Sequence, residues 1–209
     1  QGLYARMNSL YVAAAGAAAF LEPELLTLPE NMRKDATARR DALNSCDIAF
    51  LCLPDDAAIE AADMVENPSV TVIDTSTAHR VSPDWVYGLP ELSGQRDKLA
   101  VARRIANPGC HATGFIVLTA PLAAAGILPS DGEYSCFSLT GYSGGGKKMI
   151  AEYECESRNV LLDAPRQYGV GQQHKHLKEM AMYSGVSAPV FCPVVGDFYS
   201  GMEVIVPIF

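Results

Sequence analysis

The sequence predicts an α/β protein with two domains, the first built on a parallel sheet and the second an α+β unit with a mostly antiparallel sheet. In the first half, Asp47–Leu53 and Val70–Ile73 are apolar throughout, as strands covered on both faces must be. Pro54 ends the first of them, and Ala57–Val65 between them has the composition of a helix. Apolar strand, helix and apolar strand in this order are typical of a parallel sheet with crossover helices.

The second half contains three further strand-like segments, Tyr134–Thr140, Pro189–Val195 and Met202–Val206. The last two are joined by a glycine-rich turn that is too short to hold a crossover helix. They therefore predict antiparallel pairing and a second domain. We place the first domain at residues 1–110 and the second at residues 111–209.

The first residues, Gly2–Phe20, predict a helix because apolar side chains recur at helical spacing among alanines. No strand precedes this helix, and the chain stops at Phe209 directly after a strand. We therefore expect a chain that is truncated at both ends. The apolar part of the helix, Leu10–Leu21, is too short to span a membrane and lacks the charged start of a signal peptide.

The composition excludes two classes of partner. The chain has 209 residues, 49% of them hydrophobic, and a formal net charge of −8 without a cluster of lysine and arginine. Nucleic acids and anionic membranes require a basic surface, so we expect neither as a partner and favour small molecules. The six cysteines show no CxxC spacing, and four of them lie in or beside apolar strand-like segments. This pattern indicates reduced thiols and the cytoplasm.

Cys110 is the candidate nucleophile. It follows the turn Pro108-Gly109 and precedes the apolar segment Phe115–Leu118, which predicts that it begins a buried helix. Backbone N–H groups and the helix dipole at such a position favour the charged thiolate. Proline and glycine allow the sharp turn that would direct the thiol toward a cleft. The alternative is a small buried hydrophobic side chain, which is the common state of an intracellular cysteine.

Residues directly after the predicted parallel strands are candidate binding residues, because ligands collect at the carboxyl ends of such strands. These positions include Pro54, Ser76, Arg80 and Asn107. The guanidinium of Arg80 could hold a carboxylate or a phosphate through two hydrogen bonds. A structural salt bridge is equally consistent with its position.

A loop of three glycines, Gly144, Gly145 and Gly146, could bring backbone N–H groups close to a phosphate. It is not a Walker loop, because Lys147 is followed by Lys148 instead of serine or threonine. The alternative interpretation is a flexible hairpin turn.

His174 and His176 are candidate bases for the thiol of Cys110, because a base needs only one imidazole within hydrogen-bond reach. A zinc site would require further cysteine or histidine ligands nearby in the sequence, so we expect no metal. Taken alone, the two residues are also consistent with surface histidines.

Six segments then occur in one order along the chain: Asp74–Arg80 (DTSTAHR), Tyr87–Leu92 (YGLPEL), Asn107–Gly114 (NPGCHATG), Gly141–Glu154 (GYSGGGKKMIAEYE), His174–Met180 (HKHLKEM) and Gly201–Val204 (GMEV). Together they resemble the N-acetyl-gamma-glutamyl-phosphate reductases of the short bacterial type, in the semialdehyde dehydrogenase superfamily. The resemblance extends from about Leu25 to Phe209.

The resemblance implies a Rossmann-like NADP-binding domain followed by a catalytic and dimerisation domain, in a homo-oligomer that is a dimer or a tetramer. It implies NADPH-dependent reductive dephosphorylation of N-acetyl-glutamyl 5-phosphate to the 5-semialdehyde through a cysteine thioester, in arginine biosynthesis. The site residues that it implies are Cys110 as nucleophile, His176 or alternatively His174 as acid and base, Ser76, Arg80, Glu91 and Asn107 at the acyl-phosphate substrate, and Pro54, Gly144, Gly145 and Gly146 along the cofactor.

The sequence departs from this family at its ends. It begins after the strand and the glycine-rich turn that hold the cofactor pyrophosphate, Met7–Phe20 fits poorly, and relatives continue beyond Phe209. Three alternatives remain: a relative of aspartate-semialdehyde dehydrogenase with another acyl phosphate, a non-enzymatic fragment that contributes subunit contacts, and a cysteine hydrolase without a cofactor. The His-Lys-His motif and the glycine loop favour the reductase over the aspartate enzyme.

Overall fold

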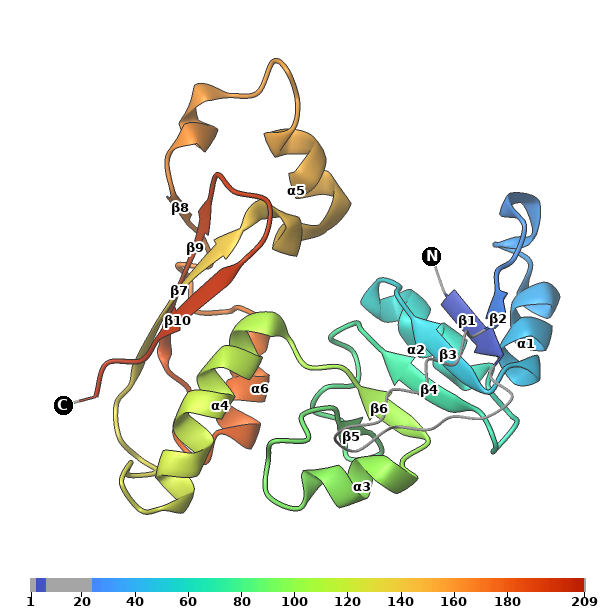
Figure 1. Cartoon of the computed structure of the whole chain (residues 1–209), viewed down its shortest axis with the longest axis horizontal. Coiled ribbons are helices and arrows are strands. Elements are labelled where there is room, and N and C mark those ends of the chain that lie inside the picture. Colours follow the sequence, from blue (N-terminus) through green and yellow to red (C-terminus); the bar gives the residue numbers. More distant parts are fainter. Residues whose placement is uncertain (1–2, 7–23, 209) are drawn as a thin grey trace. The chain divides into compact units, whose positions relative to one another are not determined.

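The computed structural model describes residues 3–6 and 24–208 and divides the chain into two compact units, Gln1–Pro108 and Gly109–Phe209 (Figure 1). The division falls two residues before the one expected from the sequence, so Cys110 belongs to the second unit. None of the helices in the described ranges combines the length and the apolarity that a membrane span requires. The apolar segment Leu10–Leu21 lies outside these ranges.

The first unit contains a six-stranded sheet with the strand order β2-β1-β3-β4-β6-β5. The strands β3, β4, β6 and β5 run parallel to one another, whereas β1 is antiparallel to both of its neighbours, β2 and β3. The bounds of the strands are β1 Leu3–Arg6, β2 Glu24–Leu26, β3 Ile48–Leu51, β4 Thr71–Asp74, β5 Val86–Tyr87 and β6 Arg104–Ala106.

The strand β1 shows that the helix expected over Gly2–Phe20 is wrong at Leu3–Arg6. The backbone of Tyr4 is paired with Leu26 on one side and with Ala49 on the other. Hydrogen bonding to two neighbouring strands outweighs the helix propensity of a short segment. The remainder of the expected helix, residues 7–20, lies outside the described residues.

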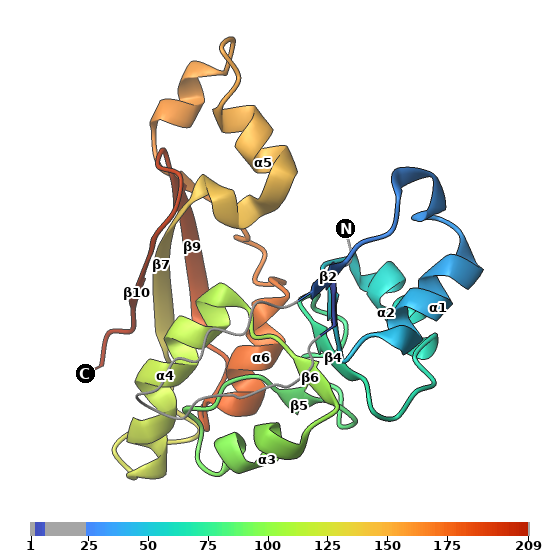
Figure 2. The same ribbon diagram turned by 45° about the vertical axis from the view of Figure 1, so that its right-hand side comes forward.

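Helices α1 (Ala36–Ser45) and α2 (Asp55–Asp63) pack against the sheet of the first unit and share one hydrophobic core with β3 and β4 (Figure 2). Leu43, Leu51 and Val72 are fully buried in this core. The expected order of strand, helix and parallel strand is confirmed by β3, α2 and β4. The unit also contains the 3-10 helix η1 (Glu30–Met32) and helix α3 (Gln95–Val101).

The second unit contains a four-stranded mixed sheet with the order β10-β7-β9-β8. The strands are β7 (Ser135–Gly141), β8 (Arg166–Gln167), β9 (Val190–Gly196) and β10 (Met202–Ile205). Two of the three pairings are antiparallel, as expected, but the longest, β7 with β9, is parallel. The expected pairing of the last two strands is wrong, because β7 lies between them. The chain between β7 and β9 contains two α-helices and is long enough for a crossover, so it permits the parallel pairing.

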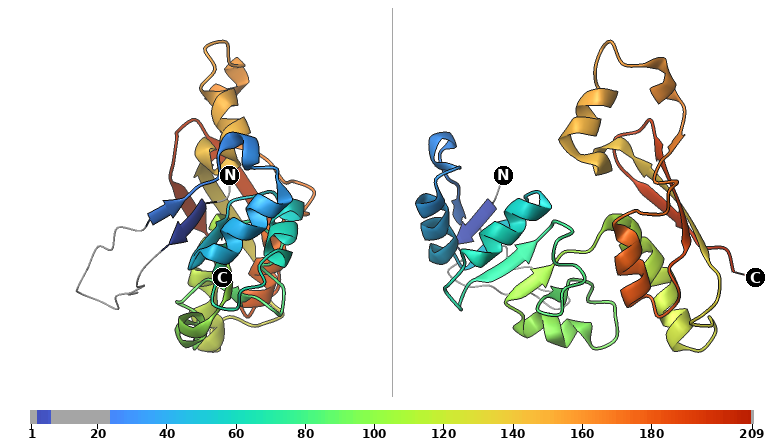
Figure 3. Two further views of the ribbon diagram at one scale, coloured as in Figure 1. Left: turned by 90° about the vertical axis from the view of Figure 1, so that its right-hand side faces the viewer. Right: turned by 180° about the vertical axis from the view of Figure 1, so that it is seen from behind.

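Helices α4 (Cys110–Ala124) and α6 (His176–Tyr183) lie side by side on one face of this mixed sheet (Figure 3). Helix α5 (Gly146–Tyr153) and the 3-10 helices η2 (Tyr142–Gly145) and η3 (Val160–Asp163) complete the unit. Helix α4 approaches β10 closely at Gly114, where an added Cβ would lie 2.5 Å from Cγ2 of Val204. The first residues of α4 and α6 are thereby held over the same face of the sheet.

Candidate functional site

Cys110 is the first residue of helix α4, as the sequence predicts, and its side chain is exposed. The preceding Gly109 is buried and occupies the N-cap position in an extended conformation. The interpretation of Cys110 as a buried hydrophobic side chain is therefore wrong. The thiol is accessible and lies at the positive end of a helix of 15 residues.

His176 lies close to this thiol. Sγ of Cys110 and one ring nitrogen each of His111 and His176 all lie within 4.8 Å of one another. A single water molecule can bridge such a distance, so His176 is within reach of the thiol proton. His176 is only 6% exposed and begins helix α6, which excludes the interpretation as a surface histidine.

His111 is a site residue that sequence reasoning missed. It follows Cys110 directly and is buried, with Nδ1 2.7 Å from Oγ of Ser138 and Nε2 2.8 Å from the hydroxyl of Tyr168. Burial and, to a lesser extent, the charge of His174 lower the pKa of His111 to about 4, so the ring is neutral at pH 7. A signal was present, because His111 lies one helical turn before Phe115 and therefore on the buried face of the helix.

Cysteine and histidine are also the ligand types of zinc, and three such atoms converge here. Both ring nitrogens of His111, however, already form hydrogen bonds with hydroxyl groups. A zinc ion would have to displace one of them. The arrangement therefore supports a thiol and an adjacent base better than a metal centre.

His174 contacts both of the other imidazoles. Its ring centroid lies 4.7 Å from that of His176 and 5.8 Å from that of His111. Its Nδ1 accepts a hydrogen bond from the backbone N–H of His176 at 3.2 Å, so it holds the start of α6 in place. Burial, followed by the charge of Lys175, lowers the pKa of His174 below its ordinary value. This shift favours the uncharged form of the His174 ring beside His176.

Glu179 connects the two helices of the site. Its carboxylate Oε2 accepts the backbone N–H of Gly109 at 2.8 Å, and its side chain is only 1% exposed. Glu179 lies three residues after His176 on α6, so this one bond ties the helix that carries the base to the residue before the nucleophile. It also supplies an acceptor at the start of α4, where no side chain of the helix itself caps the N-terminus.

Tyr168 completes the group of residues beside the thiol. Burial, and then the negative charge of Cys110, raise the pKa of its hydroxyl to about 12. The phenol is therefore protonated at pH 7 and can donate a hydrogen bond to Nε2 of His111. The sequence offered no signal for Tyr168 beyond its position six residues before His174.

The four residues expected at the substrate, Ser76, Arg80, Glu91 and Asn107, all lie in the first unit. Ser76 is buried, and its hydroxyl donates to Oδ2 of Asp74 at 2.7 Å. Arg80 is also buried, and its Nη2 donates to the carbonyl of Thr75 at 3.0 Å. Glu91 and Asn107 are exposed, as is Pro54, the residue expected along the cofactor.

The glycine loop leads from β7 through η2 into α5, so the hairpin interpretation is wrong. The three glycines differ in their surroundings. A Cβ at Gly145 would lie 2.4 Å from the sulfur of Met149, whereas Gly146 has nothing within 4 Å and Gly144 only Oγ1 of Thr140 at 3.4 Å. The backbone is therefore open to a ligand at Gly144 and Gly146, and packing explains the glycine at Gly145.

Comparison with known families identifies both units. The family described as "Semialdehyde dehydrogenase, NAD binding domain" matches residues 11–102, and "Semialdehyde dehydrogenase, dimerisation domain" matches residues 110–209. Among curated proteins, the N-acetyl-gamma-glutamyl-phosphate reductase of Rhizobium meliloti is 50% identical over 190 residues, which are 89% of this chain and 61% of the relative. That of Trichormus variabilis is 47% identical over 191 residues, 88% of this chain and 59% of the relative.

The chain spans about 60% of the length of these relatives. Solved structures share its fold. Aspartate semialdehyde dehydrogenase II of Vibrio cholerae matches 78% of this chain and 56% of its own with a TM-score of 0.57 at 17% identity. The aspartate semialdehyde dehydrogenase of Candida albicans, solved with NADP, gives a TM-score of 0.56 at 16% identity over 78% of this chain and 50% of its own.

Both family matches point to one family, and together they extend from residue 11 to residue 209. The curated relatives agree with the resemblance that the six sequence segments carry. The chain belongs to the semialdehyde dehydrogenase family, in which it is similar to the N-acetyl-gamma-glutamyl-phosphate reductases.

Proposed function

We propose that the chain carries the catalytic residues of an NADPH-dependent N-acetyl-gamma-glutamyl-phosphate reductase of arginine biosynthesis. The reaction converts N-acetyl-glutamyl 5-phosphate into N-acetyl-glutamate 5-semialdehyde and phosphate. The observation that carries this proposal is the exposed thiol of Cys110 within 4.8 Å of a ring nitrogen of the buried His176. The identity of about 50% to curated reductases supports the choice of substrate.

In the first step, His176 accepts the proton of the Cys110 thiol, and the thiolate attacks the acyl carbon of the substrate. The carbon–oxygen bond to phosphate breaks, phosphate leaves with the electron pair, and a thioester on Cys110 remains. The first-turn N–H groups of α4 have no acceptor within the helix and can stabilise the negative oxygen that develops in this step. The pKa values of His111 and His174 are both lowered, which favours the uncharged form of these two rings beside the thiol.

When bound, NADPH supplies the hydride that reduces the thioester carbon. His176, protonated in the first step, then donates its proton as the carbon–sulfur bond breaks, so that the aldehyde leaves and the site returns to its starting state. His176 is the preferred acid and base because its ring nitrogen lies near Sγ, and His174 remains the alternative.

The described residues fit such a cofactor in part. The parallel strands β3, β4 and β6 have the arrangement in which nucleotides bind at the carboxyl edge, where the exposed Pro54 follows β3. Gly144 and Gly146 offer open backbone for a close approach. We propose that Pro54 and Gly144–Gly146 would hold the cofactor, and that Ser76, Arg80, Glu91 and Asn107 serve the acyl phosphate.

The test is phosphate-dependent reduction of NADP⁺ by N-acetyl-glutamate 5-semialdehyde, followed by nicotinamide absorbance. Cys110→Ser should abolish the reaction, and His176→Asn should lower its rate by about 10²- to 10⁴-fold. Cys155→Ser, at another exposed cysteine, is the matched control and should leave the rate unchanged. Activity that survives Cys110→Ser, or that requires aspartate semialdehyde, would contradict the proposal.

A second readout needs no turnover. Iodoacetamide alkylates the thiolate, so the labelling of Cys110, measured peptide by peptide, reports its ionisation. His176→Asn should slow the labelling of Cys110 and leave that of Cys155 unchanged. Equal labelling of Cys110 in both proteins would show that His176 is not its base.

We also propose that two copies of the chain pair through the second unit. The matched family is named for dimerisation, and one face of the mixed sheet carries exposed apolar side chains. Phe137 and Ile205 are register partners, and Val190 lies on the same face; they are 40%, 43% and 59% exposed. Helices α4 and α6 cover the opposite face. Sedimentation should show a dimer or tetramer that Phe137→Asp converts into monomers, whereas Val101→Asp, at an exposed valine of the first unit, should not.

We further propose that the protein works in the cytoplasm. All six cysteines are free thiols, which suits a reducing compartment. Fractionation of cells that express the protein, with a cytoplasmic marker as control, tests this proposal.

A further inference from the structure

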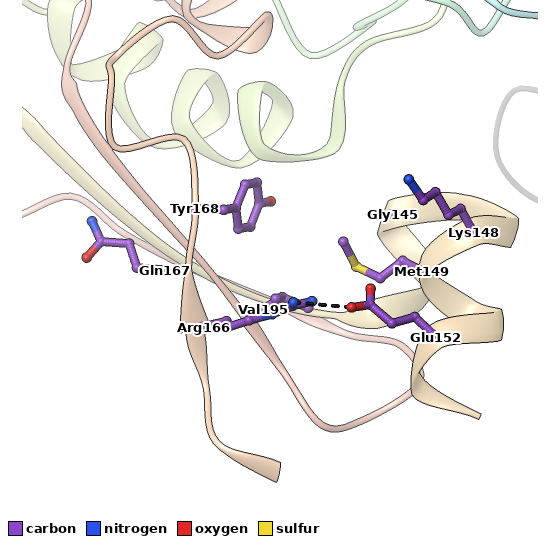
Figure 4. A pocket seen from close by; sticks show the side chains of 8 residues that line it. All are labelled: Gly145, Lys148, Met149, Glu152, Arg166, Gln167, Tyr168 and Val195. Atoms are coloured by element: carbon purple, nitrogen blue, oxygen red, sulfur yellow. Dashed lines mark hydrogen bonds and ion pairs between the residues drawn. The ribbon is translucent and has the colours of Figure 1, made fainter. Parts of the chain in front are cut away.

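The second unit contains a pocket of about 450 Å³ between helix α5 and strand β8 (Figure 4). Lys148, Met149 and Glu152 line it from α5, and Arg166 and Tyr168 line it from β8 and the residue after this strand. This volume is within the range of small-molecule sites. The mechanism proposed above does not use the charged side chains of this pocket.

Positive charge exceeds negative charge in the lining. Nη1 of Arg166 lies 3.4 Å from Oε1 of Glu152, and its guanidinium lies over the ring of Tyr153, 5.5 Å from the centroid. Among the described residues, no ion pair involves Lys148. The guanidinium is thus oriented by two neighbours, while the ammonium group of Lys148 is available to an incoming anion.

Tyr168 joins the pocket to the nucleophile. Its hydroxyl lies 2.8 Å from Nε2 of His111, the residue next to Cys110, and its pKa is raised first by burial and then by the negative charge of the Cys110 thiolate. The pocket therefore borders the group of residues that contains Cys110 and His176. Tyr168 thus belongs both to the lining of the pocket and to the group of residues around the thiol.

We propose that this pocket binds an anionic oxygen group, the α-carboxylate of the N-acetylglutamyl substrate, through Lys148 and Arg166. The inference rests on the proposed function. Arginine presents a planar fork that matches a carboxylate, and lysine adds a second positive charge. The α-carboxylate lies about 5 Å from the reacting carbonyl carbon, four bonds of roughly 1.5 Å away. Its capture would hold the acyl group at a fixed distance from the pocket.

The phosphates of NADPH are also anionic oxygen groups that Lys148 and Arg166 could bind. They are the alternative ligand because Lys148 closely follows the glycine loop, which we propose to lie along the cofactor. The experiments therefore compare two kinds of ligand. Binding of N-acetyl-L-glutamate tests whether the pocket holds the substrate, and the α-amide of this compound lacks the negative charge of the α-carboxylate. Binding of NADPH tests whether the pocket holds the phosphates of the nucleotide.

The first measurement is the binding of N-acetyl-L-glutamate to the full chain by calorimetry. Lys148→Gln and Arg166→Gln should each weaken binding at least tenfold. Lys147→Gln removes the neighbouring exposed lysine, which does not line the pocket, and should leave binding unchanged. Glu152→Gln should tighten binding several-fold, because it removes the carboxylate that competes for Arg166. Circular dichroism confirms that each variant is folded.

The second measurement distinguishes the sources. The α-amide should bind the unaltered chain at least tenfold more weakly than N-acetyl-L-glutamate, and this difference should disappear in Arg166→Gln. NADPH should bind all of these proteins equally. If Lys148→Gln and Arg166→Gln weaken NADPH binding alone, or if N-acetyl-L-glutamate does not bind the unaltered chain, the proposal is overturned.

These outcomes do not depend on turnover. A chain that binds N-acetyl-L-glutamate with the expected pattern, but does not reduce NADP⁺, contradicts the proposed function and supports the pocket. A chain that reduces NADP⁺ with an unchanged Michaelis constant for the semialdehyde in Lys148→Gln and Arg166→Gln contradicts the pocket and supports the function.

Discussion

Glu179 provides a quantitative test of how the site is held together. Glu179→Ala removes the acceptor of the Gly109 N–H and leaves this buried donor without a partner. An unsatisfied buried N–H costs about 2 kcal/mol, and the lost side-chain packing adds about 1 kcal/mol. Glu179→Gln retains an acceptor oxygen and loses only the charge, which is worth about 1 kcal/mol in such a bond. We therefore expect Glu179→Ala to destabilise the second unit by about 3 kcal/mol and Glu179→Gln to destabilise it by about 1 kcal/mol.

Hydrogen exchange of the peptide that contains Gly109 measures this difference locally. About 2 kcal/mol between the two variants corresponds to about 30-fold faster exchange in Glu179→Ala. The only tryptophan, Trp85, lies in the first unit, so its fluorescence during urea denaturation reports that unit and should be equal in both variants. Equal exchange at Gly109 in the two variants would refute the argument that the carboxylate of Glu179 secures the start of α4.

Three further predictions concern stability. The folded pKa of His111, about 4, lies below its ordinary value of 6.5, so the unfolded chain binds the proton first as the pH falls. Between pH 7 and pH 4, this difference should lower the free energy of unfolding of the second unit by about 3 kcal/mol. Urea titrations at the two pH values should find a smaller loss in His111→Asn. The same pH dependence in both proteins would contradict the prediction. Gly114→Ala forces a Cβ against Val204 and should lower the stability of the second unit by about 1 to 3 kcal/mol. Leu118→Ala, at an exposed position of the same helix, is the control and should lower it much less when both variants are compared by thermal unfolding. Asp35→Ala removes the side chain that accepts a hydrogen bond from the Ala38 N–H at 2.7 Å, and it should destabilise the first unit by about 1 kcal/mol. Urea denaturation followed by Trp85 fluorescence measures this change. An unchanged denaturation midpoint would show that this N-cap is dispensable.

The local elements of the first unit were predictable because their signals lie in adjacent residues. An apolar segment ended by Pro54, a helix and a second apolar segment predict β3, α2 and β4 from their order alone. The same locality explains the error at Leu3–Arg6. A strand that is stabilised by pairing with segments more than 15 residues away leaves no periodic signal of its own.

The mixed sheet shows where such reasoning ends. Strand composition predicts Tyr134–Thr140, Pro189–Val195 and Met202–Val206, within one residue of β7, β9 and β10, but it does not specify which of these strands are neighbours. The order was decided by the crossover that α5 and α6 allow. Pairing between distant segments depends on packing and loop closure, which no single segment encodes.

The sequence alone determined that Cys110 would begin a helix behind a Pro-Gly turn, because turn chemistry and apolar periodicity are local properties. Only the tertiary structure decided which groups surround that thiol. Gly109 and Glu179 are separated by 70 positions, yet one hydrogen bond of 2.8 Å joins them, and it brings His176 to the same place. The surroundings of His111 and Tyr168 were decided in the same way, because burial and hydrogen bonding arise only when distant segments pack together.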